Sequence, residues 1–311
     1  MKLTALAALT LLAPSSLWAQ TIDQSLTWAT GSTIVIELPR GDLQVRGSDS
    51  QQINVSGQLD DDTKAFIFEQ RGDELLIEVK LPKQWSSHQD KNKQYSDLVI
   101  TLPQQAGVEI EVVSTDVEIN QLTQLALETV SGDIKVTDGQ GQFEIDAVSG
   151  DVRLANLSGE LDIEAVSGDI SANNCQGEIE LSTVSGDANA QQLSGKLTLE
   201  SVSGDVNIDA DELVSLQGRS VSGDVKIEAD RLAARIELEL ETVSGDVTLQ
   251  IDQLGDVNVS AHAGGGGSIR NDWSEHRASK SKYGGNKSLQ FGNGPQQVRL
   301  NTVSGDLNLR K

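Results

Sequence analysis

The chain has 311 residues, a formal net charge of −23 at pH 7 and 3% aromatic residues. A charge of this sign argues against nucleic acids and anionic membrane surfaces as partners, because both repel an acidic protein. The single cysteine, Cys175, excludes a framework of disulfides within the chain.

Residues 1–19 have the pattern of a secretory signal peptide. Lys2 supplies the positive charge, residues 3–13 are mostly apolar, and cleavage is predicted before Gln20. Gln20 is not a cysteine, so no lipoprotein anchor is expected there. No other segment approaches the roughly 18 apolar residues of a membrane span. We therefore expect an exported protein, in the periplasm or on the surface of a bacterial cell.

Residues 20–112 alternate apolar and polar residues in short runs, which predicts strands. The expected strands are 33–38, 42–46, 52–58, 64–69, 75–81 and 98–102. We interpret the region as degenerate β coils with an N-terminal cap, because an open apolar end would aggregate. A small separate β-sandwich is the alternative. The Arg-Gly-Asp tripeptides at 40–42 and 71–73 are interpreted as strand junctions rather than as integrin-binding motifs.

The tetrapeptide Val-Ser-Gly-Asp, called the word below, then recurs through the rest of the chain. Its first five copies are 18 residues apart, and the following gaps are 19, 22 and 60. Each 18-residue unit has two halves, and in each half a turn containing glycine precedes alternating apolar residues. A fixed period predicts a repeat architecture, and alternation predicts strands. The copies begin at Val130, Val148, Val166, Val184, Val202, Val221, Val243 and Val303.

These units predict an all-β fold, a single-stranded parallel β-solenoid (β-helix) with coils of about 18 residues over 113–263. Aligned copies form apolar ladders, such as Ile134, Val152 and Ile170, which no coil can bury alone. Coils stacked at about 4.8 Å bury them together. The valine of the word is interpreted as one more such ladder, and its glycine as a corner that needs a positive φ.

The aspartate of the word forms a further ladder, which we interpret as a structural turn without metal. Neighbouring charges repel by roughly 1 kcal/mol in water, whereas a hydrogen bond to a charged acceptor stabilises by about 1.5–3 kcal/mol. Calcium between coils is the alternative, since calcium-binding β-rolls also have coils of two nine-residue halves. The ladder comprises Asp133, Asp151, Asp169, Asp187, Asp205, Asp224, Asp246 and Asp306.

Two loops carry the candidate binding residues. One is the polar stretch 81–96, and the other is the glycine-rich excursion 264–297, which precedes a final coil at 298–311. Aromatic side chains beside arginine or lysine are typical of recognition surfaces. Rings that fold back as lids over the solenoid are nevertheless the favoured interpretation, and an exposed recognition surface is the alternative. The candidates are Trp273, Tyr283, Arg270, Arg277, Lys280 and Lys282 in the excursion, with Trp85 and Tyr95 in the earlier loop.

The recurrent Thr-Val-Ser-Gly-Asp runs at 129–133, 183–187, 242–246 and 302–306, with a glycine-rich interruption before the last, resemble a bacterial family. It is the "putative adhesin" β-strand repeat family, a domain of unknown function. The resemblance implies a β-solenoid in the cell envelope and brings no catalytic residues.

The favoured function is an exported, non-catalytic scaffold or adhesin-like binding module, with an envelope protein or a glycan as partner. A calcium-stabilised β-roll and a polysaccharide-active β-helix enzyme are the alternatives. The enzyme is disfavoured because His88, His262 and His276 lack metal-ligand spacing and no Gly-x-Ser-x-Gly elbow occurs.

Overall fold

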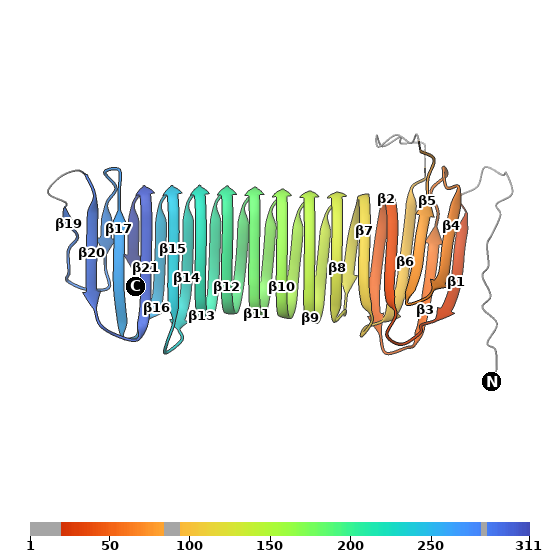
Figure 1. Cartoon of the computed structure of the whole chain (residues 1–311), viewed down its shortest axis with the longest axis horizontal. Helices are drawn as coiled ribbons and strands as arrows, with labels where there is room; N and C mark the ends of the chain where they lie inside the picture. Colours follow the sequence, from red (N-terminus) through yellow and green to blue (C-terminus); the bar gives the residue numbers. More distant parts are fainter. Residues whose placement is uncertain (1–19, 84–93, 281–284) are drawn as a thin grey trace. The chain divides into compact units, whose positions relative to one another are not determined.

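The computed structural model describes residues 20–83, 94–280 and 285–311, and the chain divides into two compact units, Met1–Asp146 and Ala147–Lys311. Every element is a strand, and most neighbouring strands are parallel (Figure 1). The prediction of an all-β solenoid is confirmed. Within the described ranges, the structure has no helix that is long and apolar enough to cross a membrane.

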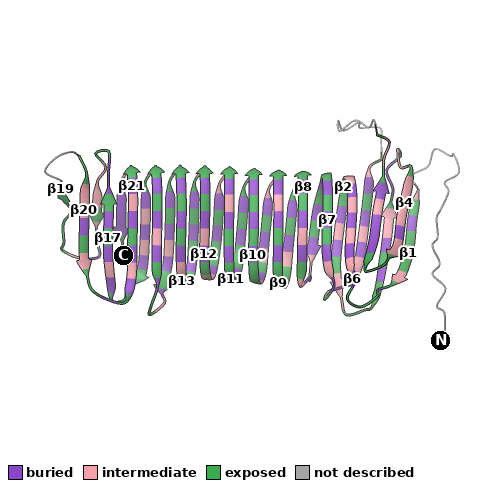
Figure 2. Cartoon of the chain, viewed as in Figure 1, coloured by how far each residue is buried: buried purple, intermediate pink, exposed green. Residues whose placement is uncertain are grey.

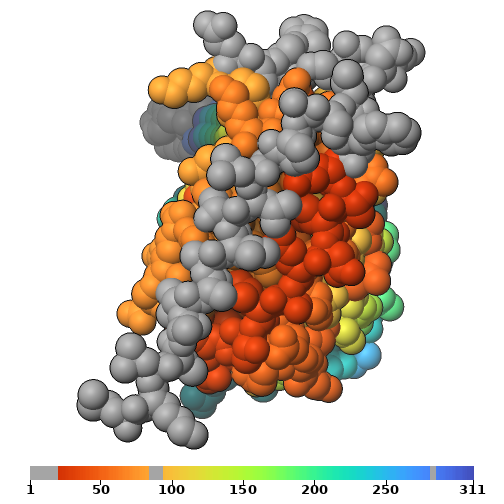
Figure 3. All heavy atoms as spheres, turned by 90° about the vertical axis from the view of Figure 1, so that its right-hand side faces the viewer, coloured from red at the N-terminus to blue at the C-terminus, as the bar shows by residue number. Residues whose placement is uncertain are grey.

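Unit 1 combines solenoid coils with antiparallel strands. Strand β2 is parallel to β5, β6 and β7, whereas the pairs β1–β3, β3–β6 and β4–β5 are antiparallel. The earliest strands, red and orange in Figure 3, lie on one end of this unit. The strands are β1 (Thr21–Thr27), β2 (Thr33–Ser48), β3 (Gln52–Gln58), β4 (Ala65–Arg71), β5 (Glu74–Lys80), β6 (Ser96–Pro103), β7 (Gly107–Asn120), β8 (Gln124–Ser131) and β9 (Ile134–Ser149).

The first Arg-Gly-Asp tripeptide forms a corner of the solenoid. Gly41 has a φ of 126° and lies in register with Thr115, where other coils carry the word. Arg40 is only 5% exposed, and its guanidinium donates hydrogen bonds to the carboxylates of Asp60 and Asp62. This arginine is therefore engaged inside unit 1, as expected for a strand junction.

Unit 2 contains the regular coils. Strands β10 to β13 each form one coil, with Val152, Ile170, Ala188 and Val206 in register. One corner is the glycine of the word, and the other is a left-handed residue: Asn156, Asn174 and Gln192 have φ of 57°, 53° and 55°. Asparagine tolerates this conformation better than most residues.

The remaining strands of unit 2 are shorter, because each coil is divided between two of them. The strands of unit 2 after β9 are β10 (Val152–Ser167), β11 (Ile170–Ser185), β12 (Ala188–Ser203), β13 (Val206–Ser222), β14 (Val225–Leu232), β15 (Glu237–Ser244), β16 (Val247–Gln253), β17 (Val257–Ala263), β18 (Ile269–Asn271), β19 (Ser279–Lys280), β20 (Lys287–Gly292), β21 (Gln296–Ser304) and β22 (Leu307–Arg310).

Burial alternates along each strand, as Figure 2 shows by its purple and green bands. The apolar ladders that the alignment predicts, such as Val152 and Ile170, are buried. The prediction that the valine of the word is also an inward ladder is wrong. Leu161, Ile163 and Ala165 point inward at every second position, so Val166 faces outward. The buried residue at this corner is the one that precedes the valine.

That preceding position holds alanine before Val148 and Val166 and a hydroxyl residue before the other copies. Ser201 and Ser220 are buried, and within the described residues their hydroxyl oxygens have no hydrogen-bond partner. A buried hydroxyl without a partner destabilises the folded state. We therefore expect the double variant Ser201→Ala, Ser220→Ala to raise the free energy of unfolding by about 1–2 kcal/mol in urea denaturation.

The matched control for this prediction is Ser203→Ala, because Ser203 is an exposed serine in the same strand as Ser201. We expect almost no change from the control. A lower stability of the double variant would contradict the prediction, since it would mean that these hydroxyls make stabilising contacts.

The last coil of the chain is not the outermost coil of unit 2. Strand β21 pairs with β15 on one side and with β17 on the other (Figure 1). Strand β22 lies between β16 and β18. The final coil that the sequence predicts at 298–311 is therefore an inner coil of unit 2. The excursion supplies the outer strands instead: β20 pairs antiparallel with β17, and β19 with β20.

Candidate functional site

The described loop residues that the sequence singles out have different surroundings. Trp85, Tyr283 and Lys282 lie outside the described residues. Tyr95 is half-buried, with the guanidinium carbon of Arg40 4.8 Å from its ring centroid. Arg270, Arg277 and Lys280 are exposed on the excursion.

Trp273 is not the exposed aromatic that the binding hypothesis requires. Its side chain is buried, and its indole N–H donates a hydrogen bond to the backbone carbonyl of Arg310. The backbone N–H of Trp273 donates to the side-chain oxygen of Asn271 at 3.1 Å, which fixes the turn after β18. The tryptophan thus packs over the end of β22, which is the arrangement of a lid.

The aspartate ladder is hydrogen-bonded from coil to coil. In each case the backbone N–H of one aspartate donates to Oδ1 of the aspartate in the adjacent coil, at 2.7–3.1 Å. This contact differs from a hydrogen bond within a single turn, because donor and acceptor belong to different coils. Among the described residues, no group of three or more His, Cys, Asp or Glu side chains is arranged to hold a metal ion.

One predicted basic residue does meet this ladder. Arg270 lines a hollow of about 440 Å³ together with Arg310 and the last aspartates of the ladder. The pKa of Asp306 is lowered, first by hydrogen bonds from Ser268 and then by the nearby charges of Arg270 and Lys287. The carboxylate at this end of the ladder is therefore kept ionised.

A row of exposed valines runs along unit 2, one per word. We call it the valine stripe, and its members are 46–62% exposed. An apolar side chain repeated in every coil forms a continuous apolar surface, unlike the scattered apolar residues of an ordinary protein surface. The valine stripe comprises Val148, Val166, Val184, Val202, Val221, Val243 and Val303.

A second row lies beside the valine stripe, two residues earlier in the coils of Val166 to Val303. We call it the polar row; its members are in register from strand to strand. Arg219 Nη1 lies 3.5 Å from Glu200 Oε1, and the amide of Asn301 donates to Glu241 at 3.5 Å. The polar row comprises Glu164, Ser182, Glu200, Arg219, Glu241, Asn301 and His262.

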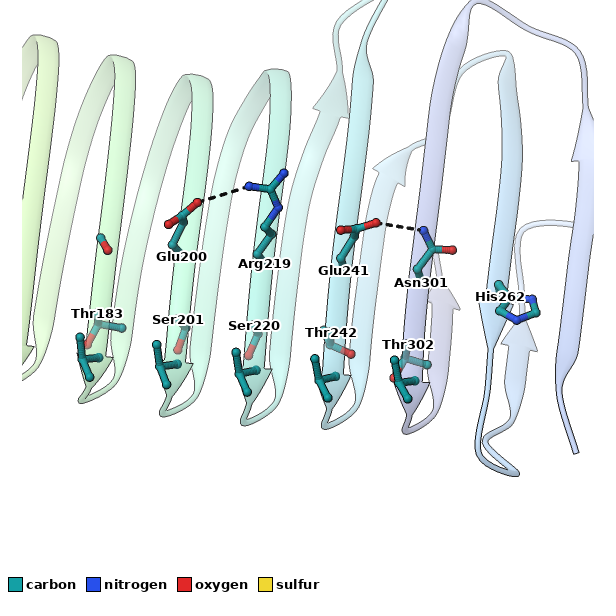
Figure 4. Close-up of a pocket in the computed structure, with 16 residues that line it drawn as sticks. Thr183, Glu200, Ser201, Arg219, Ser220, Glu241, Thr242, His262, Asn301 and Thr302 are labelled. Carbon is teal, nitrogen blue, oxygen red and sulfur yellow. Dashed lines mark hydrogen bonds and ion pairs between the residues drawn. The ribbon is translucent and has the colours of Figure 1, made fainter.

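From Ser182 and Val184 onward, the valine stripe and the polar row border a groove of about 580 Å³ (Figure 4). Residues two apart in a strand point to the same face, so Glu200 and Val202 both point outward while Ser201 between them points inward. The backbone of the buried position therefore forms the floor. This groove offers an apolar wall, a wall of carboxylates with one guanidinium, and hydrogen-bonding groups, which suits noncovalent binding.

Sequence reasoning missed this groove because it assigned the valines to the core. The signal that could have found it is the alternation itself: counted through the word, it places every valine outside. Aromatic side chains are rare in this sequence, so the pattern favours the loop aromatics as binding candidates instead.

The outer face next to the groove concentrates negative charge. The pKa of Glu180 is raised, first by burial and then by Asp162 and Glu200, with smaller effects of Glu164 and Glu178. A carboxyl whose pKa is higher in the folded state destabilises the fold once it ionises. The contribution of Glu180 is therefore favourable at acid pH and is lost as the pH rises through its folded-state pKa.

We expect Glu180→Gln to raise the melting temperature at pH 7, because glutamine removes the unfavourable charge. The gain should shrink as the pH falls towards 4, where Glu180 of the parent protein also becomes protonated. Melting curves of both proteins between pH 4 and 8 measure this difference. The control is Glu212→Gln, since Glu212 accepts hydrogen bonds from Arg231 and should lose rather than gain stability. An equal gain at every pH would contradict the prediction.

Comparisons with known proteins agree with the resemblance seen in the sequence. No curated protein matches the chain. A solved structure described as a putative cell adhesion protein from Clostridium sporogenes is similar at 12% identity, over 94% of this chain and 99% of that one, with a TM-score of 0.23. The profile of the Toastrack DUF4097 family matches residues 32–232 and 212–310, which together span most of the sequence. The chain therefore belongs to the Toastrack DUF4097 family.

Proposed function

We propose that the protein is an exported, non-catalytic binding module of the bacterial cell envelope, and that the valine stripe is its contact surface. The observation that carries the proposal is the stripe itself. Half-exposed valines continue from Val148 to Val303 with no charged residue among them. Contiguous apolar patches of this kind mark interaction sites on soluble proteins.

The groove indicates what a partner must present. Apolar groups would pack against valines such as Val202 and Val221, and hydrogen-bond donors would meet Glu200 and Glu241 on the opposite wall. A protein or a glycan of the envelope can supply both kinds of group. The location rests on the signal pattern of residues 1–19, which lie outside the described residues.

The positions of the carboxylates and hydroxyls favour binding over a calcium-stabilised β-roll and over a polysaccharide-active enzyme. Oδ1 of most ladder aspartates already accepts a backbone N–H, which supports a structural role rather than calcium coordination. The groove's hydroxyl residues, such as Ser201 and Thr242, are buried at its floor rather than presented to a substrate.

A pull-down from envelope extracts tests the proposal. The immobilised protein, residues 20–311, is compared with the variant Val202→Asp, Val221→Asp, which places charge in the middle of the stripe. The matched control is Val214→Asp, because Val214 is 43% exposed but lies outside the stripe in the same strand as Val221. Melting curves verify that all three proteins are folded.

We expect an envelope protein or glycan to be retained by the parent protein and by Val214→Asp, and to be lost by the double variant. Equal retention by all three would contradict the assignment of the stripe. If retention were instead lost in a variant with Arg270, Arg277 and Lys280 changed to alanine, the contact surface would be the excursion.

A further inference from the structure

We infer that the valine stripe of one molecule packs against the valine stripe of a second copy of this chain, with the two solenoids antiparallel. The inference rests on the proposed function, since it names a partner for the same surface. Its first support is spacing. Coils in a β-solenoid repeat at about 4.8 Å, and a second copy presents valines at that same spacing, so the methyl groups of both stripes can interlock along their whole length.

The second support is the order of charges in the polar row. From Glu164 to Asn301, the row reads negative, neutral, negative, positive, negative, neutral. An antiparallel pair with its two-fold axis between the coils of Glu200 and Arg219 brings each row against the reversed row of the other molecule. Glu200 then faces Arg219 of the second copy, and Arg219 faces Glu200, so two ion pairs form across the axis.

The other members of the row also avoid repulsion in this arrangement. Glu241 faces Ser182 of the second copy, and Glu164 faces Asn301, so no glutamate of the row faces a glutamate. Both neutral partners can donate hydrogen bonds to a carboxylate. The charge order of the polar row is therefore self-complementary when it is reversed.

A parallel pair lacks this match. A two-fold axis along the solenoid that keeps stripe against stripe places the two polar rows on opposite sides of the contact, so Glu200 and Arg219 gain no partner in the second copy. An axis shifted towards the polar row would instead bury Glu200 and Glu241 against valine side chains, which is unfavourable for charges. The antiparallel pair is also closed, since the same patch serves both molecules and no further copy can add to it.

Sedimentation velocity over a series of protein concentrations tests the inference on residues 20–311. We expect a monomer–dimer equilibrium for the parent protein and for Val214→Asp. The variant Val202→Asp, Val221→Asp should dimerise at least about tenfold more weakly, because these valines lie at the centre of the interface. A parent protein that stays monomeric throughout, or a double variant that dimerises as well as the parent, would overturn the inference.

A charge exchange tests the antiparallel register. Arg219→Glu places two glutamates opposite each other at both sides of the axis and should also weaken the dimer about tenfold or more. The double variant Glu200→Arg, Arg219→Glu exchanges the charges and should restore the dimer. Dimerisation that is indifferent to Arg219→Glu, or that the exchange does not restore, would overturn the register.

The pull-down separates this inference from the proposed function. A stripe-dependent envelope partner, captured by a protein that is monomeric at every concentration, would support the proposed function and overturn the dimer. A stripe-dependent dimer that captures no envelope component would support the dimer and count against an envelope partner at this surface.

Discussion

Replacing Gly204 with alanine is expected to lower the free energy of unfolding by about 4 kcal/mol or more, enough to leave unit 2 largely unfolded. Gly204 has a φ of 131°, a backbone conformation that residues other than glycine rarely adopt. An added Cβ would lie 2.1 Å from the carbonyl oxygen of Gly186 and 2.7 Å from its carbon. The obstacle is backbone of the adjacent coil, so no side chain can move aside. Circular dichroism during chemical denaturation measures the loss.

Gly266→Ala is the control that separates the steric clash from backbone strain. Gly266 also has a positive φ, 90°, but nothing lies within 4 Å of the added Cβ. This variant should lose only about 1–2 kcal/mol, the strain of the backbone conformation alone. Equal losses in the two variants would contradict the argument that the close approach of the coils dictates the glycine of the word.

Replacing Arg40 with methionine is expected to destabilise unit 1 by about 3–5 kcal/mol, because it leaves the carboxylate of Asp60 buried without its counter-charge. The Asp60 side chain has no exposed surface, and Arg40 Nη2 donates to Asp60 Oδ1 and to Asp62 Oδ2 at 2.9 Å each. Denaturation monitored by circular dichroism measures the effect. Arg40→Lys should restore little, since lysine cannot make the paired contacts of a guanidinium.

Two variants serve as controls for this prediction. Arg231→Met removes an exposed guanidinium that lies 2.7 Å from Glu212, and should change the stability very little, because water screens an exposed ion pair. The double variant Arg40→Met, Asp60→Asn should be more stable than Arg40→Met alone, because no unpaired charge remains. If Arg40→Met lost no more stability than Arg231→Met, burial of the Asp60 carboxylate would not be the source of the effect.

The coil architecture could be predicted because it depends on period alone. Eighteen-residue spacing and two-residue alternation determine the coil length and the buried ladders, such as Ile163 and Leu181, whatever the neighbouring coils contain. The valines were misassigned because their apolar character was given more weight than their place in the alternation. Trp273 has no repeat partner, so the sequence leaves open whether it is a lid or a binding residue, and only the fold shows that it covers the end of β22.

Strand pairing in unit 1 was less accessible to sequence reasoning. The predicted strand at 52–58 coincides with β3, yet its antiparallel pairing with β1 and β6 follows from tertiary packing rather than from local pattern. Strand β1 was not predicted at all. The candidate groove differs from these pairings, since the period and the alternation together place both of its rows on the outer face of the coils.

The position of β21 and β22 has a consequence for the order in which unit 2 folds. Residues 257–271 precede residues 296–310 in the chain, yet their strands dock on the coils of unit 2 through β21 and β22. Coils up to β16 can assemble one after another along the chain, whereas β17 and β18 must wait until residues 296–310 have docked. Deleting residues 296–311 would thus remove an internal layer of unit 2 and leave β17 and β18 without their parallel partners.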